Sequence, residues 1–235
     1  MTLLELERVT KRYRRGCLEL TALREVSLEV HPAEVVAVWG LEGSGRTTLL
    51  RIAAAIEAPD RGEVRFRGRT LAAGESPIAR GIAYCQPRFR GIEGEPVLDQ
   101  LIAAQLALGI RPSGAREHAW AALERTCAQR CERRRPFELD PAQATRVSVA
   151  RALVQQPSLL LIDEPTRGVD LLERDGILEL LHALSREGLA VLMSAQKGTA
   201  VLGADRVLSL SDGALHGHGS PEFADVVRLP QRARA

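Results

Sequence analysis

Apolar and polar positions along this chain follow two different periods. Strand-like segments, which either alternate or are apolar throughout, are 3–10, 23–30, 35–39, 62–68, 158–162, 189–193 and 206–210. Helix-like segments are 96–129, 142–155 and 171–186. Pro112 and Gly114 predict a break in the first of these helical segments. Because fully apolar strands alternate with helices, the pattern predicts a parallel α/β sheet.

The helical stretch in the middle of the chain interrupts the strand pattern. We therefore expect one domain over residues 1–235, with a helical subdomain inserted at approximately residues 90–157. Hydrophobic residues make up 45% of the chain and charged residues 26%, which is typical of a soluble globular protein. The net charge of +2 gives no reason to expect nucleic-acid binding.

The chain carries no sign of a membrane span, a leader or a metal cluster. No run approaches the ~18 apolar residues of a membrane span, and the first residues lack a signal-peptide pattern. We therefore expect a cytosolic protein that reaches a membrane only through a partner. Of the four cysteines, Cys127 and Cys131 lie four residues apart, but there is no second such pair and no histidine nearby. This favours reduced thiols over a zinc site.

A glycine-rich segment, Gly40-Leu-Glu-Gly-Ser-Gly-Arg-Thr-Thr48, follows the apolar run 35–39. Gly40 and Gly45 have the spacing of the phosphate-binding template G-x-x-x-x-G-K-[S/T], and Thr47 fills its hydroxyl position. Glycines allow backbone N–H groups to approach a phosphate, and the start of the following helix adds partial positive charge. The candidate phosphate-binding residues are Gly40, Gly43, Ser44, Gly45, Arg46, Thr47 and Thr48.

Arg46 replaces the lysine of that template. Lysine is a compact point charge, whereas arginine is a wide planar fork, so the exchange is not conservative. Arg46 can still attract a phosphate, but its shape predicts a poorer fit beneath the β- and γ-oxygens. A strand, turn and helix that bind nothing is the alternative interpretation of this segment.

Two carboxylates, Asp163 and Glu164, follow the apolar run 158–162. A buried strand of a parallel sheet carries such residues to its carboxyl edge, where phosphate chemistry occurs. We expect Asp163 to hold Mg²⁺ together with Thr47, and Glu164 to polarise an attacking water.

These motifs resemble the nucleotide-binding subunit of an ATP-binding cassette (ABC) transporter. The resemblance also includes Asp163-Glu-Pro-Thr-Arg-Gly-Val-Asp170, the helix Arg146-Val-Ser-Val-Ala-Arg-Ala-Leu153 and the late segment 204–213. It implies a phosphate-loop NTPase core with a mostly parallel sheet, an N-terminal antiparallel β subdomain and an inserted α-helical subdomain. It also implies that Tyr13 stacks on the adenine of ATP.

The resemblance implies partners and a location as well. A second nucleotide-binding subunit would pair head to tail with this chain as a homodimer or heterodimer, enclosing ATP and Mg²⁺. A separate transmembrane permease would be driven by that dimer, with this chain cytoplasmic and peripheral on the inner face of the cell membrane.

Several positions depart from the family pattern. Where the family has L-S-G-G-Q, the chain has Leu139-Asp-Pro-Ala-Gln143. Asp140 would bring negative charge toward a phosphate, and Pro141 removes an N–H donor. The same residues are typical of a self-capped helix start, with Asp140 as N-cap, Pro141 first and Gln143 third, and this structural interpretation is favoured.

Two further contacts of the family are altered. Ala195 occupies the position expected for the switch histidine, and Gln196 can approximate that contact only if the loop shifts by one residue. The expected order Pro-Gln is reversed in Cys85-Gln-Pro87, so that either Gln86 supplies the metal and water contact or the contact is lost.

The sequence therefore favours an ATP-binding transporter subunit with weak or absent hydrolysis. The alternative is a nucleotide-independent pseudo-ATPase scaffold or regulatory subunit of a membrane complex. A soluble cassette acting on DNA or ribosomes fits less well, because the chain has one cassette, no paired cysteine clusters and no basic excess.

Overall fold

The larger of two β-sheets is six-stranded and mostly parallel. The computed structural model describes residues 1–16, 18–86, 89, 91–196 and 198–216. In this sheet the order is β10-β9-β3-β8-β7-β6. The strands are β3 (Val35–Trp39), β6 (Ile82–Cys85), β7 (Leu159–Ile162), β8 (Ala190–Ala195), β9 (Arg206–Ser211) and β10 (Ala214–His216). All neighbours are parallel except β10, which runs antiparallel to β9, so the predicted sheet is confirmed.

The smaller sheet is antiparallel, four-stranded and formed near the N-terminus, with order β2-β1-β4-β5. Its strands are β1 (Leu4–Arg15), β2 (Leu18–Val30), β4 (Arg61–Phe66) and β5 (Arg69–Thr70). Strands β1 and β2 pair well beyond the predicted segments 3–10 and 23–30. Beyond these segments the two strands remain hydrogen-bonded to each other although side chains such as Leu18 and Leu20 are exposed. The prediction relied on buried apolar positions and therefore ended the strands too early.

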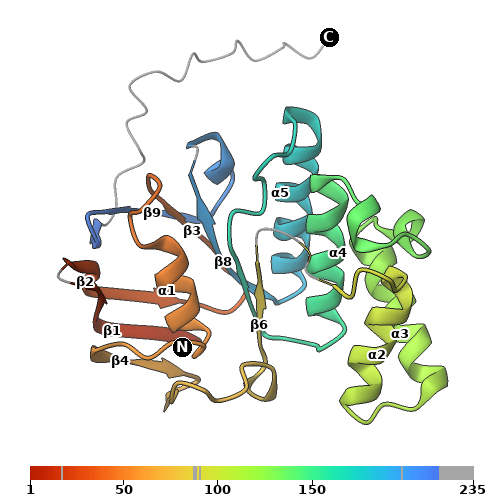
Figure 1. Ribbon diagram of the computed structural model, residues 1–235, viewed down its shortest axis with the longest axis horizontal. Helices are drawn as coiled ribbons and strands as arrows, with labels where there is room; N and C mark the ends of the chain where they lie inside the picture. Colours follow the sequence, from red (N-terminus) through yellow and green to blue (C-terminus); the bar gives the residue numbers. More distant parts are fainter. Residues whose placement is uncertain (17, 87–88, 90, 197, 217–235) are drawn as a thin grey trace.

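The described residues form five α-helices: α1 (Arg46–Ala53), α2 (Val97–Ala107), α3 (Pro112–Arg125), α4 (Pro141–Leu153) and α5 (Leu171–Arg186). Short 3-10 turns are Ile78–Arg80, Gln129–Cys131, Pro136–Glu138 and Gly198–Val201. In Figure 1, α2 and α3 lie beside α4 at the end of the molecule away from the small sheet. The predicted break is confirmed at residues 108–111, directly before Pro112, although Gly114 itself does not interrupt a helix. Pro112 begins α3, as is usual for proline at a first helical position, and Gly114 lies in the first turn of that helix.

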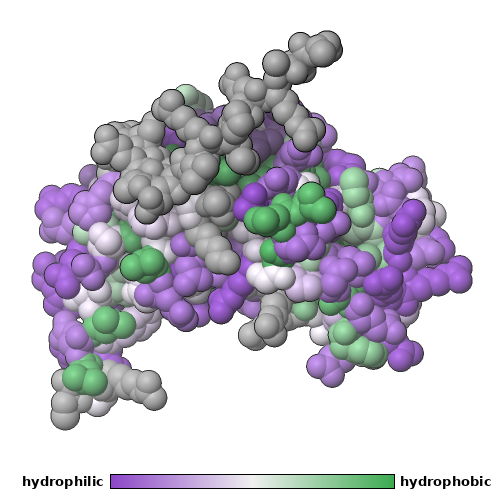
Figure 2. Space-filling model, turned by 90° about the horizontal axis from the view of Figure 1, so that it is seen from above, coloured by the Kyte–Doolittle hydropathy of each residue, from purple (hydrophilic) through white to green (hydrophobic). Residues whose placement is uncertain are grey.

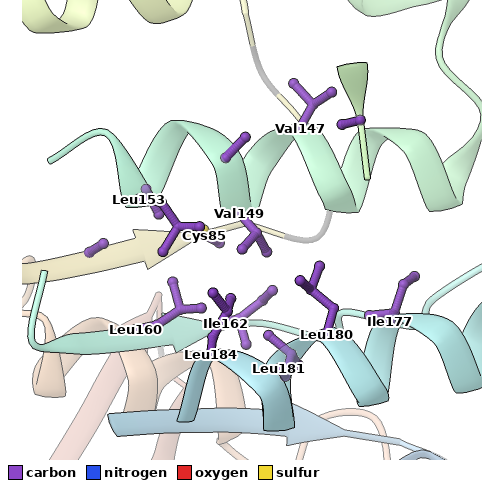
Figure 3. Packing of buried hydrophobic residues seen from close by; sticks show 14 of the residues in the cluster. Cys85, Val147, Val149, Leu153, Leu160, Ile162, Ile177, Leu180, Leu181 and Leu184 are labelled. Carbon is purple, nitrogen blue, oxygen red and sulfur yellow. The ribbon is translucent and has the colours of Figure 1, made fainter. Parts of the chain in front are cut away.

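The core consists of two apolar clusters, one on each face of the large sheet. Successive residues of a strand point to opposite faces and therefore belong to different clusters. Along β3, Val35 and Ala37 belong to one cluster and Val36 and Val38 to the other. Figure 3 shows the first cluster, in which side chains of α4, β6, β7 and α5 meet. This packing fixes the carboxyl ends of β3, β7 and β8 relative to one another.

Hydrophobic surface is scattered on the face seen in Figure 2. There, hydrophilic side chains predominate and the hydrophobic ones form small separate groups. Among the described residues, no helix combines the length and apolar character needed to cross a membrane. Among the described cysteines, Cys85, Cys127 and Cys131 form no disulfide.

Candidate nucleotide-binding site

The glycine-rich segment connects β3 to α1 as predicted, and packing requires two of its glycines. A Cβ at Gly45 would lie 2.2 Å from the carbonyl oxygen of Ala22, and one at Gly40 would lie 2.4 Å from that of Leu210. Gly45 also has φ +105°, a conformation that favours glycine. It is the N-cap residue of α1 and supplies no side-chain hydrogen bond, so the helix start keeps donors for a ligand.

Thr47 and Asp163 meet although they are far apart in the sequence. Thr47 Oγ1 donates a hydrogen bond of 2.8 Å to Asp163 Oδ2, and Ser194 Oγ donates one of 2.5 Å to Asp163 Oδ1. Asp163 is buried at the end of β7, and Ser194 lies beside it on β8. Ser194 was not among the predicted site residues, because a serine within an apolar run gives no chemical signal by itself.

Arg46 forms an ion pair with Glu164. The distance from Nη2 to Oε1 is 2.9 Å, and the two side chains are 7% and 12% exposed. Glu164 has a left-handed backbone with φ +47°, and its N–H donates to Ser194 Oγ at 2.9 Å. Arg167 Nη1 lies 3.4 Å from the other carboxylate oxygen, Oε2. The sequence placed Arg46 and Glu164 in one site but did not predict their direct contact.

The residues present fit the phosphate end of a magnesium nucleotide. Ser44 Oγ and Arg46 Nη1 are buried without a hydrogen-bond partner, which is a costly state that a phosphate oxygen would relieve. The hydroxyl of Thr47 and the carboxylate of Asp163 are oxygen ligands of the kind that Mg²⁺ prefers. The chemistry of the loop thus suits an anion, and that of Thr47 and Asp163 suits a hard cation.

Tyr13 lies beside the phosphate loop. Its hydroxyl donates to Glu57 Oε1 at 2.6 Å and lies 3.3 Å from Thr48 Oγ1. Burial, followed by the hydrogen bond to Glu57, raises the pKa of Tyr13 above its usual value. Lys11 Nζ lies 5.7 Å from the centre of the ring, within range of a cation–π contact.

Gln86 and Gln196 follow strands β6 and β8 on the same side of the sheet. Gln86 is exposed, and Pro87 of the same motif lies outside the described residues. Ala195 is only 2% exposed and packs in the core, and together with the next residue, Gln196, and with Glu164 it lines a cavity of about 440 Å³. The Trp39 indole N–H donates to the Gln196 carbonyl at 3.1 Å, which fixes this turn beside the loop.

The start of α4 is closed by its own side chains. Asp140 Oδ1 accepts the N–H of Gln143 at 2.8 Å, and Gln143 Oε1 accepts the N–H of Asp140 at 3.3 Å. Pro141 is the first helical residue. Arg134 Nη1 also donates to Gln143 Oε1, at 2.8 Å. The predicted capping box is confirmed.

The fold and the site together define an ATP-binding cassette: a parallel sheet, a phosphate loop and a carboxylate strand, with helices added on one side. The chain belongs to the ABC transporter family, whose model matches residues 23–167.

Known relatives and solved structures agree with this assignment. The lipoprotein-releasing system ATP-binding protein LolD of Paramagnetospirillum magneticum is 35% identical, over 90% of this chain and 96% of the relative. The macrolide export ATP-binding/permease protein MacB of Chlorobium luteolum is 32% identical over 97% of this chain, which spans 34% of that relative's length. The dimeric ATP-binding cassette MJ0796, in a post-hydrolysis state bound to ADP and Pi, superimposes with a TM-score of 0.82 at 25% identity. That match covers 92% of this chain and all of the other.

Proposed function

We propose that this chain binds Mg-ATP and couples that binding to a transmembrane permease, with weak or absent hydrolysis of its own. The observation that carries the proposal is the contact of the phosphate loop with the carboxylate strand through Thr47 and Asp163. Thr47 and Asp163 would hold Mg²⁺, and the loop from Gly40 to Thr48 would hold the phosphates. When bound, Mg²⁺ would neutralise phosphate charge. Tyr13, beside Thr48, would contact the adenine.

A permease partner is supported by the names of the relatives. MacB is named as an ATP-binding and permease protein, and this chain matches one third of its length. LolD is named as an ATP-binding protein of a releasing system and is matched over nearly its whole length. We infer that this chain pairs with a separate permease on the cytoplasmic face of a membrane. The two cargoes named differ although the cassettes are alike, as expected if the permease selects the cargo.

A second nucleotide-binding subunit is supported by the dimeric state of the similar cassette MJ0796. In such a pair, the start of α4 in one subunit would face the phosphate loop of the other, as the family resemblance implies. Asp140 and Pro141 would then weaken the site of the partner rather than that of their own chain. The proposal holds for a homodimer and for a heterodimer with a more competent cassette.

Weak hydrolysis is supported by three features of the described residues. Glu164 is engaged by Arg46, Gln196 stands beside the site without the proton chemistry of a histidine, and the start of α4 is self-capped. Loss of one transition-state contact typically lowers a rate by ~10²–10³. Several such losses together would make turnover very slow, although they need not add.

The self-capped α4 also favours the second candidate, a scaffold that docks on a membrane complex without using nucleotide. The orphan atoms Ser44 Oγ and Arg46 Nη1 favour ATP binding instead, because a scaffold has no need of them.

Equilibrium titration with Mg-ATP and a phosphate-release assay test both parts of the proposal. We expect saturable binding below millimolar ATP and a turnover at least ~100-fold below that of a competent cassette. Absence of binding at millimolar ATP would contradict the binding claim and favour the scaffold. Turnover at the rate of ordinary cassettes would contradict the claim of weak hydrolysis.

A further inference from the structure

The ion pair between Arg46 and Glu164 joins the phosphate loop to the carboxylate that follows β7. The guanidinium and the carboxylate are in hydrogen-bond contact at 2.9 Å, and both side chains are largely buried. In such surroundings water screens the two charges poorly, so each is largely neutralised by the other. The cation that should attract a phosphate is therefore already occupied.

We propose that Glu164 competes with the nucleotide phosphates for Arg46, so that this ion pair is a lock that sets nucleotide affinity. The proposal deepens the proposed function and rests on it, since a lock on the phosphate loop matters only if the loop binds nucleotide. Arginine suits this role because its planar fork forms directional bonds with carboxylates, whereas lysine is a mobile point charge.

Two observations indicate how the lock opens. Arg46 Nη1 is buried without a partner, so the guanidinium is not fully satisfied where it lies and gains a hydrogen bond by turning toward a phosphate. Arg167 Nη1 lies 3.4 Å from Glu164 Oε2, and its side chain is 62% exposed. Glu164 thus keeps a second counter-ion when Arg46 leaves.

The backbone of Glu164 is held by a hydrogen bond. Its N–H donates to Ser194 Oγ, which in turn donates to Asp163. Because the backbone of Glu164 is held and Arg167 stays beside its carboxylate, we expect the lock to open by movement of the arginine side chain. Until the lock opens, the Glu164 oxygen that faces Arg46 is not available to a water molecule. The same contact thus lowers affinity and withholds the carboxylate expected to polarise water.

A double-mutant cycle on nucleotide binding tests this lock. Affinity for a fluorescent ADP analogue, mant-ADP with Mg²⁺, would be measured for the wild type, Glu164→Gln, Arg46→Met and the double variant. Methionine keeps much of the arginine's length without its charge. We expect Glu164→Gln to tighten binding about tenfold when Arg46 is present, and less than about threefold in the Arg46→Met background, because only the first change breaks the pair.

Arg167→Ala provides an independent arm, because it removes the second counter-ion and leaves Glu164 to Arg46 alone. We expect it to weaken binding by about threefold in the wild type and to have no effect in Glu164→Gln. Far-UV circular dichroism and melting temperatures identify any variant that has lost its fold. The unfolding free energies of the wild type, Glu164→Gln, Arg46→Met and the double variant give a readout without nucleotide. The Arg46–Glu164 pair should show coupling in these free energies as well.

The outcomes separate the lock from the proposed function. Equal tightening by Glu164→Gln in both backgrounds would mean simple repulsion of phosphate and would overturn the lock, as would any weakening. If neither the wild type nor Glu164→Gln binds mant-ADP, the proposed ATP binding is overturned instead. Binding by Glu164→Gln but not by the wild type would support the lock strongly.

Discussion

Two helix starts in this molecule have opposite chemistry. At α1, the N-cap residue Gly45 provides no side-chain hydrogen bond, and two buried polar atoms nearby lack partners. At α4, Asp140 and Gln143 satisfy each other's backbone N–H groups. A helix N-terminus attracts an anion only while its donors are free. The start of α1 is therefore open to an anion, whereas the start of α4 is closed by its own side chains.

The largest expected effect is that of Gly45→Ala, which would distort the open start of α1. The new Cβ would lie 2.2 Å from the Ala22 carbonyl, and φ +105° is strained for alanine. We expect a loss of roughly 3 kcal/mol in the free energy of unfolding, measured by urea denaturation, together with loss of nucleotide binding. Gly43→Ala is the matched control, because its φ is also positive but its Cβ would meet no atom within 4 Å. Equal losses in the two variants would contradict the clash.

Ser194→Ala would loosen the carboxylates opposite the open start. It leaves Asp163 Oδ1 and the Glu164 N–H without their hydroxyl partner in a buried place. We expect a loss of about 2 kcal/mol in unfolding free energy and weaker Mg-dependent nucleotide binding. Calorimetric melting and a titration with and without Mg²⁺ measure these effects. A variant as stable as the wild type would show that the hydroxyl contributes nothing.

Asp140→Ala would uncap the closed start. Losing an N-cap acceptor costs about 1 kcal/mol, whereas Asp140→Ser keeps a capping oxygen and should cost much less. Comparing the urea midpoints of these two variants isolates the cap from the charge. Neither variant should alter the nucleotide affinity of the isolated subunit, because this helix start is separate from the phosphate loop. A change in that affinity would place Asp140 in the same site.

Opening the closed start sharpens the comparison further. Asp140→Ser combined with Pro141→Gly removes the negative charge and restores an N–H donor. If the closed start limits hydrolysis in a dimer, ATP turnover should rise by about tenfold relative to the wild type. Phosphate release at matched dimer concentration measures this, and an unchanged rate would move the limitation to Arg46 and Glu164.

The smallest expected effect concerns Tyr84, which lies near Asp163 at the same edge of the sheet. Its titration changes stability only at high pH and not near neutral pH. Burial, and next the negative charge of Asp163, raises the pKa of Tyr84 to about 12 from an ordinary 10.0. Because the folded state favours the protonated phenol, its contribution to stability is complete below about pH 10 and is lost as the pH rises from 10 to about 12. Phenolate absorbance measures this titration, and Asp163→Asn should lower the pKa. Tyr84→Phe identifies the signal, and a titration unaltered by Asp163→Asn would contradict the charge effect.

Local patterns in the sequence predicted what is locally determined. The bounds of β3 and α5 agree with the apolar runs, and the Asp140 cap follows from three neighbouring side chains. Strand β6 was not predicted, because Ile82–Cys85 is too short to establish a period. The Arg46–Glu164 contact was not predicted either, since no local rule relates residues that only the sheet brings together.

The register of the central strand has a consequence for synthesis of the protein. Val35 pairs with Val191 and Val36 with Arg206, so both hydrogen-bonding edges of β3 are filled by strands made much later. During translation this fully apolar strand has no native neighbour until nearly the whole cassette has emerged. Long-range parallel pairing of this kind forms slowly and exposes chains to aggregation. A chain that ends before β9 would therefore leave one hydrogen-bonding edge of Val35–Trp39 unpaired and open to association with other chains.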